Sequence, residues 1–428
     1  MAAGDLTAEA LVAALLKRIE AREPDVLAWS HLDGEVALAQ ARDRDKALAY
    51  GHAPGPLHGL PVALKDIIDT ADMPTENGSA LFKGRMPAAD ATATRLLREA
   101  GAVIMGKTVT TEFALSGARQ TRNPHDPART PGGSSSGSAG AVAAGMVPLA
   151  LGSQTGGSML RPASFCGVHG YKPSFGSISR AGVFSLSRRL DHLGVYARAL
   201  ADLALLGDVL MVFDATDTEM RCHAGRDLVR ALAEPLDAAP RIKVFRGEPW
   251  ANLEAGTEAA FETCLARLGC AIGRADDKAG EGALGVHATI MDASAHANLG
   301  CHLARADELL PETARRIAAG KDIKAAAYVR AVDRAAEIAR ALDGLFDDAD
   351  VLVSPAAPGE APLGLERTGS PVFQKIWTLA GMPTLNLPAM QGPNGMPIGL
   401  QLIGRRGGDR NLFRVAQWME GNGLYAND

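Results

Sequence analysis

One lysine and two glycine-rich loops that contain serine are the parts of this 428-residue chain best suited to covalent chemistry. Lys65 follows a short apolar run, Ser134 lies in a Gly/Ser stretch at 131–139, and Ser158 ends a Gly-Gly-Ser sequence 24 residues later. A serine hydroxyl attacks an amide only when a base takes its proton. An uncharged lysine can be that base if burial lowers its pKa from about 10.4 toward neutrality. These residue types therefore fit acyl transfer.

Histidine is not expected to move the proton. The ten histidines lie in no HExxH, HxH or comparable ligand pattern, so each is expected to be a surface or hydrogen-bonded side chain. They are His31, which is expected near a helix end, and His52, His58, His125, His169, His192, His223, His287, His296 and His302. The five cysteines form no CxxC pair, so neither a disulfide framework nor a zinc site is indicated. No metal and no organic cofactor is predicted.

Two short patterns match known motifs in their letters but not in their expected structure. Residues 101–108 fit a P-loop, yet a helix is expected before Gly101 and an apolar β-branched run fills the place of the flexible loop. Residues 133–137 fit G-x-S-x-G with Ser135 as the nucleophile, yet 123–131 are expected to form a loop instead of the strand that such a turn requires. Neither nucleotide binding nor an α/β-hydrolase is predicted.

Three blocks of the sequence resemble the amidase signature family. They are GLPVALKD at 59–66, PGGSSSGSA at 131–139 and GSQTGGS at 152–158. The resemblance spans roughly residues 5–205 and returns at 349–407, where GMPIGLQLIG is also similar to the family's ending. Residues 205–345 match only loosely. The resemblance implies an enzyme that hydrolyses carbon–nitrogen bonds.

The resemblance also assigns roles by position. It implies that Ser158 is the nucleophile, that Ser134 is a bridging serine with a cis peptide bond, and that Lys65 is the base of a Ser-Ser-Lys triad. Ser134 can relay a proton because a hydroxyl both donates and accepts. The family's oxyanion hole falls on the backbone of Thr155, Gly156, Gly157 and Ser158.

Two departures from the common family pattern concern the neighbourhood of the nucleophile. Gln154 stands where most members carry Asp, and the arginine, Arg161, comes three residues after Ser158 instead of two. This form is similar to malonamidase-type members, in which the arginine binds the free carboxylate of the substrate. Arg161 is therefore predicted to bind a substrate carboxylate, and the alternative is that it pairs with a structural carboxylate or carbonyl.

Further candidates lie next to the bridging serine. Gly133 and Ser135 are expected to contribute to substrate binding. Ser135 and Ser136 could hydrogen-bond Lys65 or Ser134, or they could cap the helix that follows. The sequence leaves these two possibilities open.

The elements that must position these loops alternate between strand and helix. Apolar periodicity predicts helices at 7–21, 35–50, 92–100, 138–146 and 410–420, and strands at 60–64, 102–105, 147–152, 350–354, 384–388 and 397–403. This order predicts an α/β architecture with a mixed or parallel sheet. The resemblance implies the amidase-signature fold, with a mixed β-sheet core flanked by α-helices. The whole chain, 1–428, is expected to form a single amidase domain. Within it, 205–345 is expected to be a variable helical cover that shapes the substrate cleft, with helices at 257–268 and 322–343.

Composition excludes several classes of protein. With 44 Lys and Arg against 49 Asp and Glu, the net charge is −5, and no clustered basic surface for nucleic acid is indicated. The longest stretch almost free of polar side chains, 139–151, is too short to cross a bilayer. Asp5 stands where a signal peptide carries positive charge, so a cytoplasmic protein is expected.

The predicted function is hydrolysis of a C–N bond of a small amide through an acyl-Ser158 intermediate. One alternative is a carbamate (urethane), ester or aryl-amide hydrolase that uses the same triad. Another is a partner-dependent subunit similar to those of amidotransferases. The expected partner is a small-molecule amide or carbamate, with neither nucleic acid nor membrane, and the assembly considered is a homodimer. The acyl group, the amine and the oligomeric state stay open.

Overall fold

A computed structural model describes residues 5–115, 117, 120–220 and 227–425 of the chain. Within these residues the fold is an eleven-stranded mixed sheet covered by helices, which confirms the predicted α/β class. Cys222 and His223 lie outside the described residues. No helix in the described ranges is long and apolar enough to span a membrane.

The strands form one continuous sheet in the order β1-β3-β2-β4-β6-β5-β10-β11-β9-β7-β8. They are β1 (Trp29–Leu32), β2 (Pro61–Lys65), β3 (Val103–Thr108), β4 (Leu149–Gln154), β5 (His169–Lys172), β6 (His192–Ala197), β7 (Ile242–Val244), β8 (Ile272–Arg274), β9 (Val351–Pro355), β10 (Thr384–Gln391) and β11 (Pro397–Ile403). β2 runs parallel to β3 and β4, whereas β4, β6, β5, β10, β11 and β9 pair antiparallel in turn.

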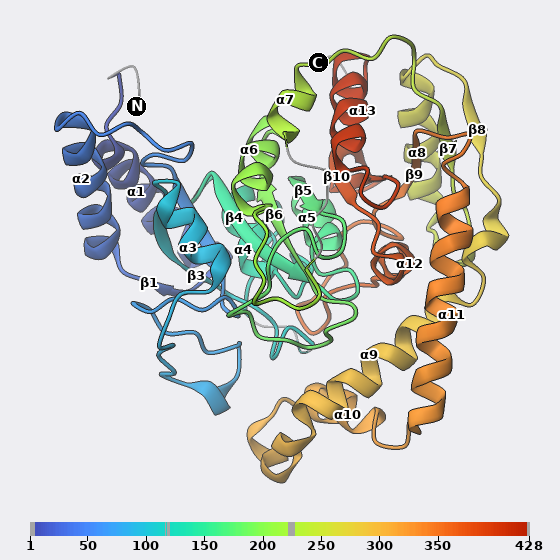
Figure 1. The fold of residues 1–428 in the computed structure, drawn as a ribbon, viewed down its shortest axis with the longest axis horizontal. Coiled ribbons are helices and arrows are strands. Elements are labelled where there is room, and N and C mark those ends of the chain that lie inside the picture. Colours follow the sequence, from blue (N-terminus) through green and yellow to red (C-terminus); the bar gives the residue numbers. More distant parts are fainter. Residues whose placement is uncertain (1–4, 116, 118–119, 221–226, 426–428) are drawn as a thin grey trace.

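The helices lie on both faces and at both ends of this sheet (Figure 1). They are α1 (Ala8–Val26), α2 (Gly34–Ala49), α3 (Thr92–Glu99), α4 (Ser136–Ala143), α5 (Leu160–Cys166), α6 (Leu200–Leu210), α7 (Leu228–Leu232), α8 (Ala255–Arg267), α9 (Ala283–Leu299), α10 (Pro311–Ala319), α11 (Ala325–Gly344), α12 (Val372–Ala380) and α13 (Asp409–Gly421). In Figure 1, α1 and α2 lie at the left end, and α9, α10 and α11 extend at the lower right.

The central strands bring Lys65 next to the end of β4 because the ends of β2 and β4 lie at the same edge of the sheet. Every residue of β2, β3, β4 and β6 is buried, as expected for strands with both faces covered. Leu64 of β2 lies opposite Leu151 of β4 in a parallel pair. The carboxyl ends of parallel strands reach the same edge of a sheet, so Lys65 at the end of β2 lies beside the end of β4.

The structure corrects two expectations. Residues 205–345 are not wholly helical, because β7 and β8 lie in this segment and extend the sheet beyond β9. These strands have three residues each, too few to show the alternation that identifies a strand in sequence. His31 lies on strand β1 and not near a helix end.

The two misleading motifs have ordinary structural roles. Residues 103–108 of the P-loop pattern form strand β3, and the Nζ of Lys107 donates to the Thr75 hydroxyl at 2.6 Å and to the Ile68 carbonyl. Ser135 of the G-x-S-x-G pattern follows a loop and precedes α4. The backbone conformation needed for either motif is therefore not present at these positions.

The fold predicts that Gly137 cannot carry a side chain. A Cβ at Gly137 in α4 would lie 2.2 Å from the Ala28 carbonyl oxygen and 2.4 Å from the Val109 nitrogen, both of them backbone atoms. Overpacking of this kind costs about 1–3 kcal/mol or more. We expect Gly137→Ala to lower the melting temperature clearly. Gly140→Ala is the matched control in the same helix, because its Cβ would meet Val26 only at 3.4 Å. Equal melting temperatures for the two variants would contradict this packing.

Candidate active site

The buried amine of Lys65 is the centre of the site. Lys65 ends β2, is fully buried, and its Nζ donates to the hydroxyl of Ser134 at 2.6 Å and to that of Ser153 at 2.7 Å. Burial lowers its pKa well below the usual value, and the negative charge of Asp191 opposes this shift only in part. A lysine that burial keeps neutral has a lone pair and can accept a proton.

Ser134 lies in the loop that leads into α4. The peptide bond between Gly133 and Ser134 is cis, as the resemblance implied. Its carbonyl oxygen, on Gly133, accepts a hydrogen bond from the guanidinium of Arg161. The carbonyl oxygen of Ser134 accepts from the backbone N–H of Thr111 at 3.2 Å. The loop is thus held on both sides of the hydroxyl that contacts Lys65.

Ser158 lies in the turn that joins β4 to α5, and it is 9% exposed. Its hydroxyl makes no hydrogen bond with Ser134 in the described part of the chain. The structure therefore joins Lys65 and Ser134 directly and places Ser158 on the turn that follows Ser153. Hydrogen bonds between catalytic groups often tighten only when substrate is bound.

Gln154 holds the start of this turn. Its Oε1 accepts from the backbone N–H groups of Met159 at 2.9 Å and Leu160 at 3.2 Å, and its Nε2 donates to the hydroxyl of Thr378 at 3.0 Å. Two N–H groups at the beginning of α5 are satisfied in this way. An amide at this position keeps the acceptor that an aspartate would offer and adds a donor for α12.

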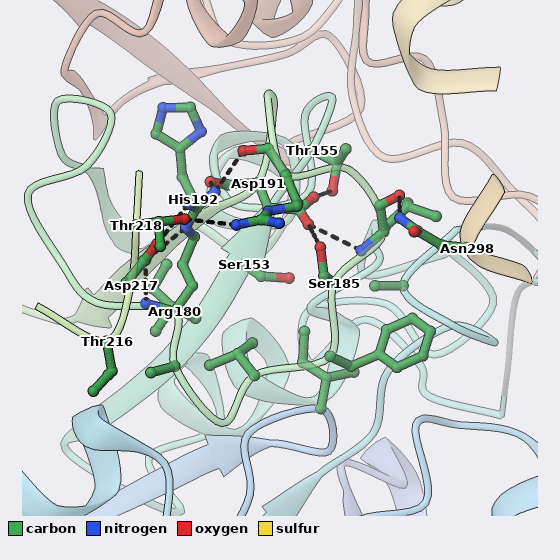
Figure 2. Close-up of a pocket in the computed structure, with 18 residues that line it drawn as sticks. Ser153, Thr155, Arg180, Ser185, Asp191, His192, Thr216, Asp217, Thr218 and Asn298 are labelled. Atoms are coloured by element: carbon green, nitrogen blue, oxygen red, sulfur yellow. Dashed lines mark hydrogen bonds and ion pairs between the residues drawn. The ribbon is translucent and has the colours of Figure 1, made fainter. Parts of the chain in front are cut away.

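Thr155 is anchored on its other side by a carboxylate. The Thr155 hydroxyl donates to Asp191 at 2.6 Å, and Asp191 also accepts from the backbone N–H groups of Leu186 and Ser187 (Figure 2). Burial raises the pKa of Asp191, and these hydrogen bonds act in the opposite direction. Ser153, Thr155 and Asp191 line a cavity of about 260 Å³, which therefore borders the second hydroxyl partner of Lys65.

Arg161 is buried among neutral acceptors. It is 5% exposed and donates to the carbonyl oxygens of Gly133 and Gly369 and to the hydroxyl of Thr368. Among the described residues it forms no ion pair with a carboxylate, and burial lowers its pKa to about 10. This pairing with carbonyls is the alternative that the sequence left open. It favours a structural role for Arg161 over the predicted binding of a substrate carboxylate.

The two serines after Ser134 bond to backbone groups and not to the lysine. The Ser135 hydroxyl is fully buried and lies 3.2 Å from both the carbonyl oxygen and the N–H of Ser153. Ser136 donates to the Val109 carbonyl at 3.4 Å. Neither side chain caps α4 or contacts Lys65. A role for Gly133 and Ser135 in substrate binding stays a prediction, which the complete burial of Ser135 does not favour.

Sequence reasoning missed several side chains that contact the turn. Ser153 is inside the third motif block, so its place near the end of β4 next to Lys65 was open to deduction. Thr378 and His287 come from α12 and α9, far away in the chain, and no local pattern marks them. In the described residues no group of three His, Cys, Asp or Glu side chains is arranged to hold a metal ion.

A family model described as Amidase matches residues 10–413. The chain belongs to the amidase signature family. Among its relatives, a glutamyl-tRNA(Gln) amidotransferase subunit from Chloroflexus aurantiacus is 36% identical over 97% of this chain and 93% of the relative. The predicted family is thus confirmed, and the enzyme class with it.

Solved structures show the same fold. One, reported as a vestigial protein complex that reveals the evolutionary origins of an s-triazine catabolic enzyme, has a TM-score of 0.92 and 31% identity over 99% of this chain and 96% of that chain. The native peptide amidase from Stenotrophomonas maltophilia has a TM-score of 0.84 and 28% identity over 100% of this chain and 96% of that chain. The amidase-signature fold predicted for this chain is confirmed.

The state of Lys65 predicts the pH dependence of activity. Only the neutral amine can accept a proton, and its fraction increases as the pH rises through the pKa of Lys65 in the folded protein. Because that pKa is lowered, we expect kcat/KM to rise with pH along a limb that lies below the ordinary lysine range. The negative charge of Asp191 limits this lowering.

Initial-rate measurements from pH 5 to 10 on wild type and on a His125→Gln control check this limb. We expect both proteins to show it, and Lys65→Arg to be inactive at every pH because a guanidinium stays charged. A limb that disappears in His125→Gln would assign the base to histidine instead.

The contacts of Arg161 predict the effect of removing it. Because the guanidinium holds the carbonyl next to Ser134, we expect Arg161→Ala to lower kcat/KM roughly 10- to 100-fold for all substrates, since a hydrogen bond to a charged group contributes about 1.5–3 kcal/mol. Kinetics with malonamate and with a neutral amide of the same length check this. A loss confined to malonamate would instead support carboxylate binding.

Proposed function

We propose that this amidase cleaves the C–N bond of an amide through an acyl-enzyme on Ser158. The observation that carries the proposal is the 2.6 Å hydrogen bond between the buried Nζ of Lys65 and the hydroxyl of Ser134 in a family member. It links a neutral base to a hydroxyl that can relay a proton toward the next loop. The small exposed part of Ser158 on that loop is where a substrate carbonyl would meet the site.

The reaction runs in two halves. The Ser158 oxygen attacks the carbonyl carbon while its proton passes through the Ser134 hydroxyl to the Nζ of Lys65. The oxyanion that forms is bound by backbone N–H groups of 155–158, and the C–N bond breaks as Lys65 returns the proton through Ser134 to the leaving amine. Water then attacks the ester on Ser158, again with Lys65 as base, and releases the carboxylic acid and the free serine.

We also propose that residues 1–428 act as one catalytic domain in which 205–345 forms a wall of the substrate cleft. The support is the continuous sheet, to which this segment contributes β7 and β8, and the contact of its helix α9 with the turn before Ser158. The variable segment would then set the acyl and amine preference. A cytoplasmic location and assembly as a homodimer stay predictions.

Mass spectrometry of the intact protein tests the acyl-enzyme. Wild type is mixed with glutamine, malonamate, neutral amides, anilides, carbamates and esters, and samples are quenched in acid within milliseconds to seconds. We expect at least one substrate to add the mass of its acyl group to a peptide that contains Ser158. Ser158→Ala is the control and should carry no adduct. Turnover without an adduct at any time point would contradict the mechanism.

The same panel decides between amides and the carbamate or ester alternative. The same triad can attack any activated acyl carbon. With a carbamate substrate, departure of the amine would leave a carbonate ester on Ser158, and its hydrolysis would release the alcohol and carbon dioxide. The class that acylates Ser158 fastest at equal substrate concentration, measured at the earliest time points, is the preferred one.

We favour the alternative in which this chain carries out the reaction as a partner-dependent, amidotransferase-like subunit. It is supported by the relatives named as amidotransferase subunits, which match over 97% of this chain at 36% identity, and by the TM-score of 0.92 to a structure reported as a protein complex. In this setting the isolated chain would acylate slowly and turn over poorly. Steady-state turnover of a small amide by the purified chain at about 10 per second, the median for enzymes, would favour a stand-alone amidase instead.

A further inference from the structure

Two side chains from outside the turn bind consecutive carbonyl oxygens of the turn before Ser158. The Nε2 of His287, on α9, lies 2.8 Å from the carbonyl oxygen of Thr155. The hydroxyl of Thr378, on α12, lies 2.9 Å from the carbonyl oxygen of Gly156 and 3.0 Å from that of Gln374, and the shorter contact is the one to Gly156. The Thr155 carbonyl shares its peptide unit with the N–H of Gly156, and the Gly156 carbonyl shares its unit with the N–H of Gly157.

The orientation of each carbonyl fixes the direction of the N–H group in the same peptide unit. Both peptide bonds are trans, since the one cis bond in the described chain is Gly133–Ser134. In a trans unit the C=O and N–H bonds point in opposite directions. The N–H of Gly156 therefore points away from His287, and that of Gly157 away from Thr378. Neither N–H has a hydrogen-bond partner within the described residues.

The chemical state of His287 suits a fixed donor. The side chain is fully buried, and burial, with the charges of Lys375 and Arg316, lowers its pKa to about 3. The ring is neutral at working pH and carries one proton. That proton is on Nε2, because the carbonyl it faces can only accept. The Nδ1 atom is buried without a partner, so the ring makes one directional hydrogen bond, to Thr155.

We propose that His287 is a positioning residue for the oxyanion hole of this amidase. Its Nε2–H holds the Thr155–Gly156 peptide so that the Gly156 N–H points toward the substrate carbonyl oxygen, and Thr378 does the same for the Gly157 N–H. The inference rests on the proposed function. It assigns a task to α9, which belongs to the segment 205–345.

A flipped peptide would reverse this arrangement. Without the donor on His287, the Thr155 carbonyl loses its partner and can rotate toward the site, where it would repel a developing oxyanion. Removal of one oxyanion donor in a serine hydrolase lowers kcat about 10²- to 10³-fold. A positioning residue orients the peptide but does not itself contact the oxyanion. Its removal should therefore lower kcat less, about 10- to 100-fold, with KM nearly unchanged.

The test compares His287→Leu with His287→Gln. Leucine fills space without a donor, whereas the Nε2 of glutamine can occupy the place of the histidine Nε2 and donate to Thr155. The assays use the substrate that acylates Ser158 best. They also use a boronic acid in which boron replaces the carbonyl carbon of that acyl group, which forms a tetrahedral anion on serine, and the matching carboxylate product.

We expect His287→Leu to have a kcat that is 10- to 100-fold lower than that of wild type, and an affinity for the boronic acid that is lower by the same factor. Its affinity for the product should stay within twofold of wild type. His287→Gln should recover most of both. Three results would overturn the proposal: a wild-type kcat in His287→Leu, equal losses of kcat in His287→Leu and His287→Gln, or a loss of product affinity equal to the loss of boronic acid affinity. If wild type itself forms no Ser158 adduct, the proposed function has failed, and that result is separate from the comparison of variants.

Thr378 provides a second pair in case His287→Leu does not fold. Thr378→Val has nearly the same shape but lacks both the donor for the Gly156 carbonyl and the acceptor for the Nε2 of Gln154, and Thr378→Ser keeps the hydroxyl that makes both contacts. We expect Thr378→Val to lose kcat and affinity for the boronic acid, and Thr378→Ser to recover most of both. Wild-type kcat and boronic acid affinity in a folded Thr378→Val protein would overturn the proposal.

Discussion

The structure of this protein depends on an amine that is held out of water between two hydroxyl groups. The Nζ of Lys65 is fully buried and contacts Ser134 and Ser153, which are neutral. An ammonium in this position would lose its hydration and gain only hydroxyl oxygens and the distant influence of Asp191. Burial therefore favours the neutral amine, which is the form that can take a proton from serine.

The surrounding architecture keeps this amine dry and its partners fixed. Strands β2 and β4 are buried along their whole length and run parallel, so the end of one strand presents Lys65 and the end of the other presents Ser153. Arg161 then ties the Gly133 carbonyl to the loop at 368–369, which links the loop that carries Ser134 to the far part of the chain. Side chains from α9 and α12 complete the enclosure of the turn before Ser158. Residues far apart in sequence thus converge on one short loop.

Motifs made of neighbouring residues could be predicted, and contacts between distant segments could not. The end of a buried strand at Lys65 and the glycine-rich loop around Ser134 follow from local apolar runs and spacing, and the cis bond at Ser134 followed from the family resemblance. His287 lies 132 positions from Thr155, and only the packing of α9 against the turn brings the two together. The short strands β7 and β8 were missed because three residues carry too little pattern. Arg161 shows the intermediate case, since its position was found but its carbonyl partners depend on the loop at 368–369.

The protonation state of Lys65 can be measured directly. Protein with lysines labelled at Cε and Nζ is titrated by NMR, and the signal of Lys65 is assigned by its absence in Lys65→Met. Our account predicts a titration midpoint well below the ordinary lysine value of about 10.4, with the neutral amine present at the pH of maximal activity. A midpoint at or above that ordinary value would show a charged ammonium in the site and would contradict the account.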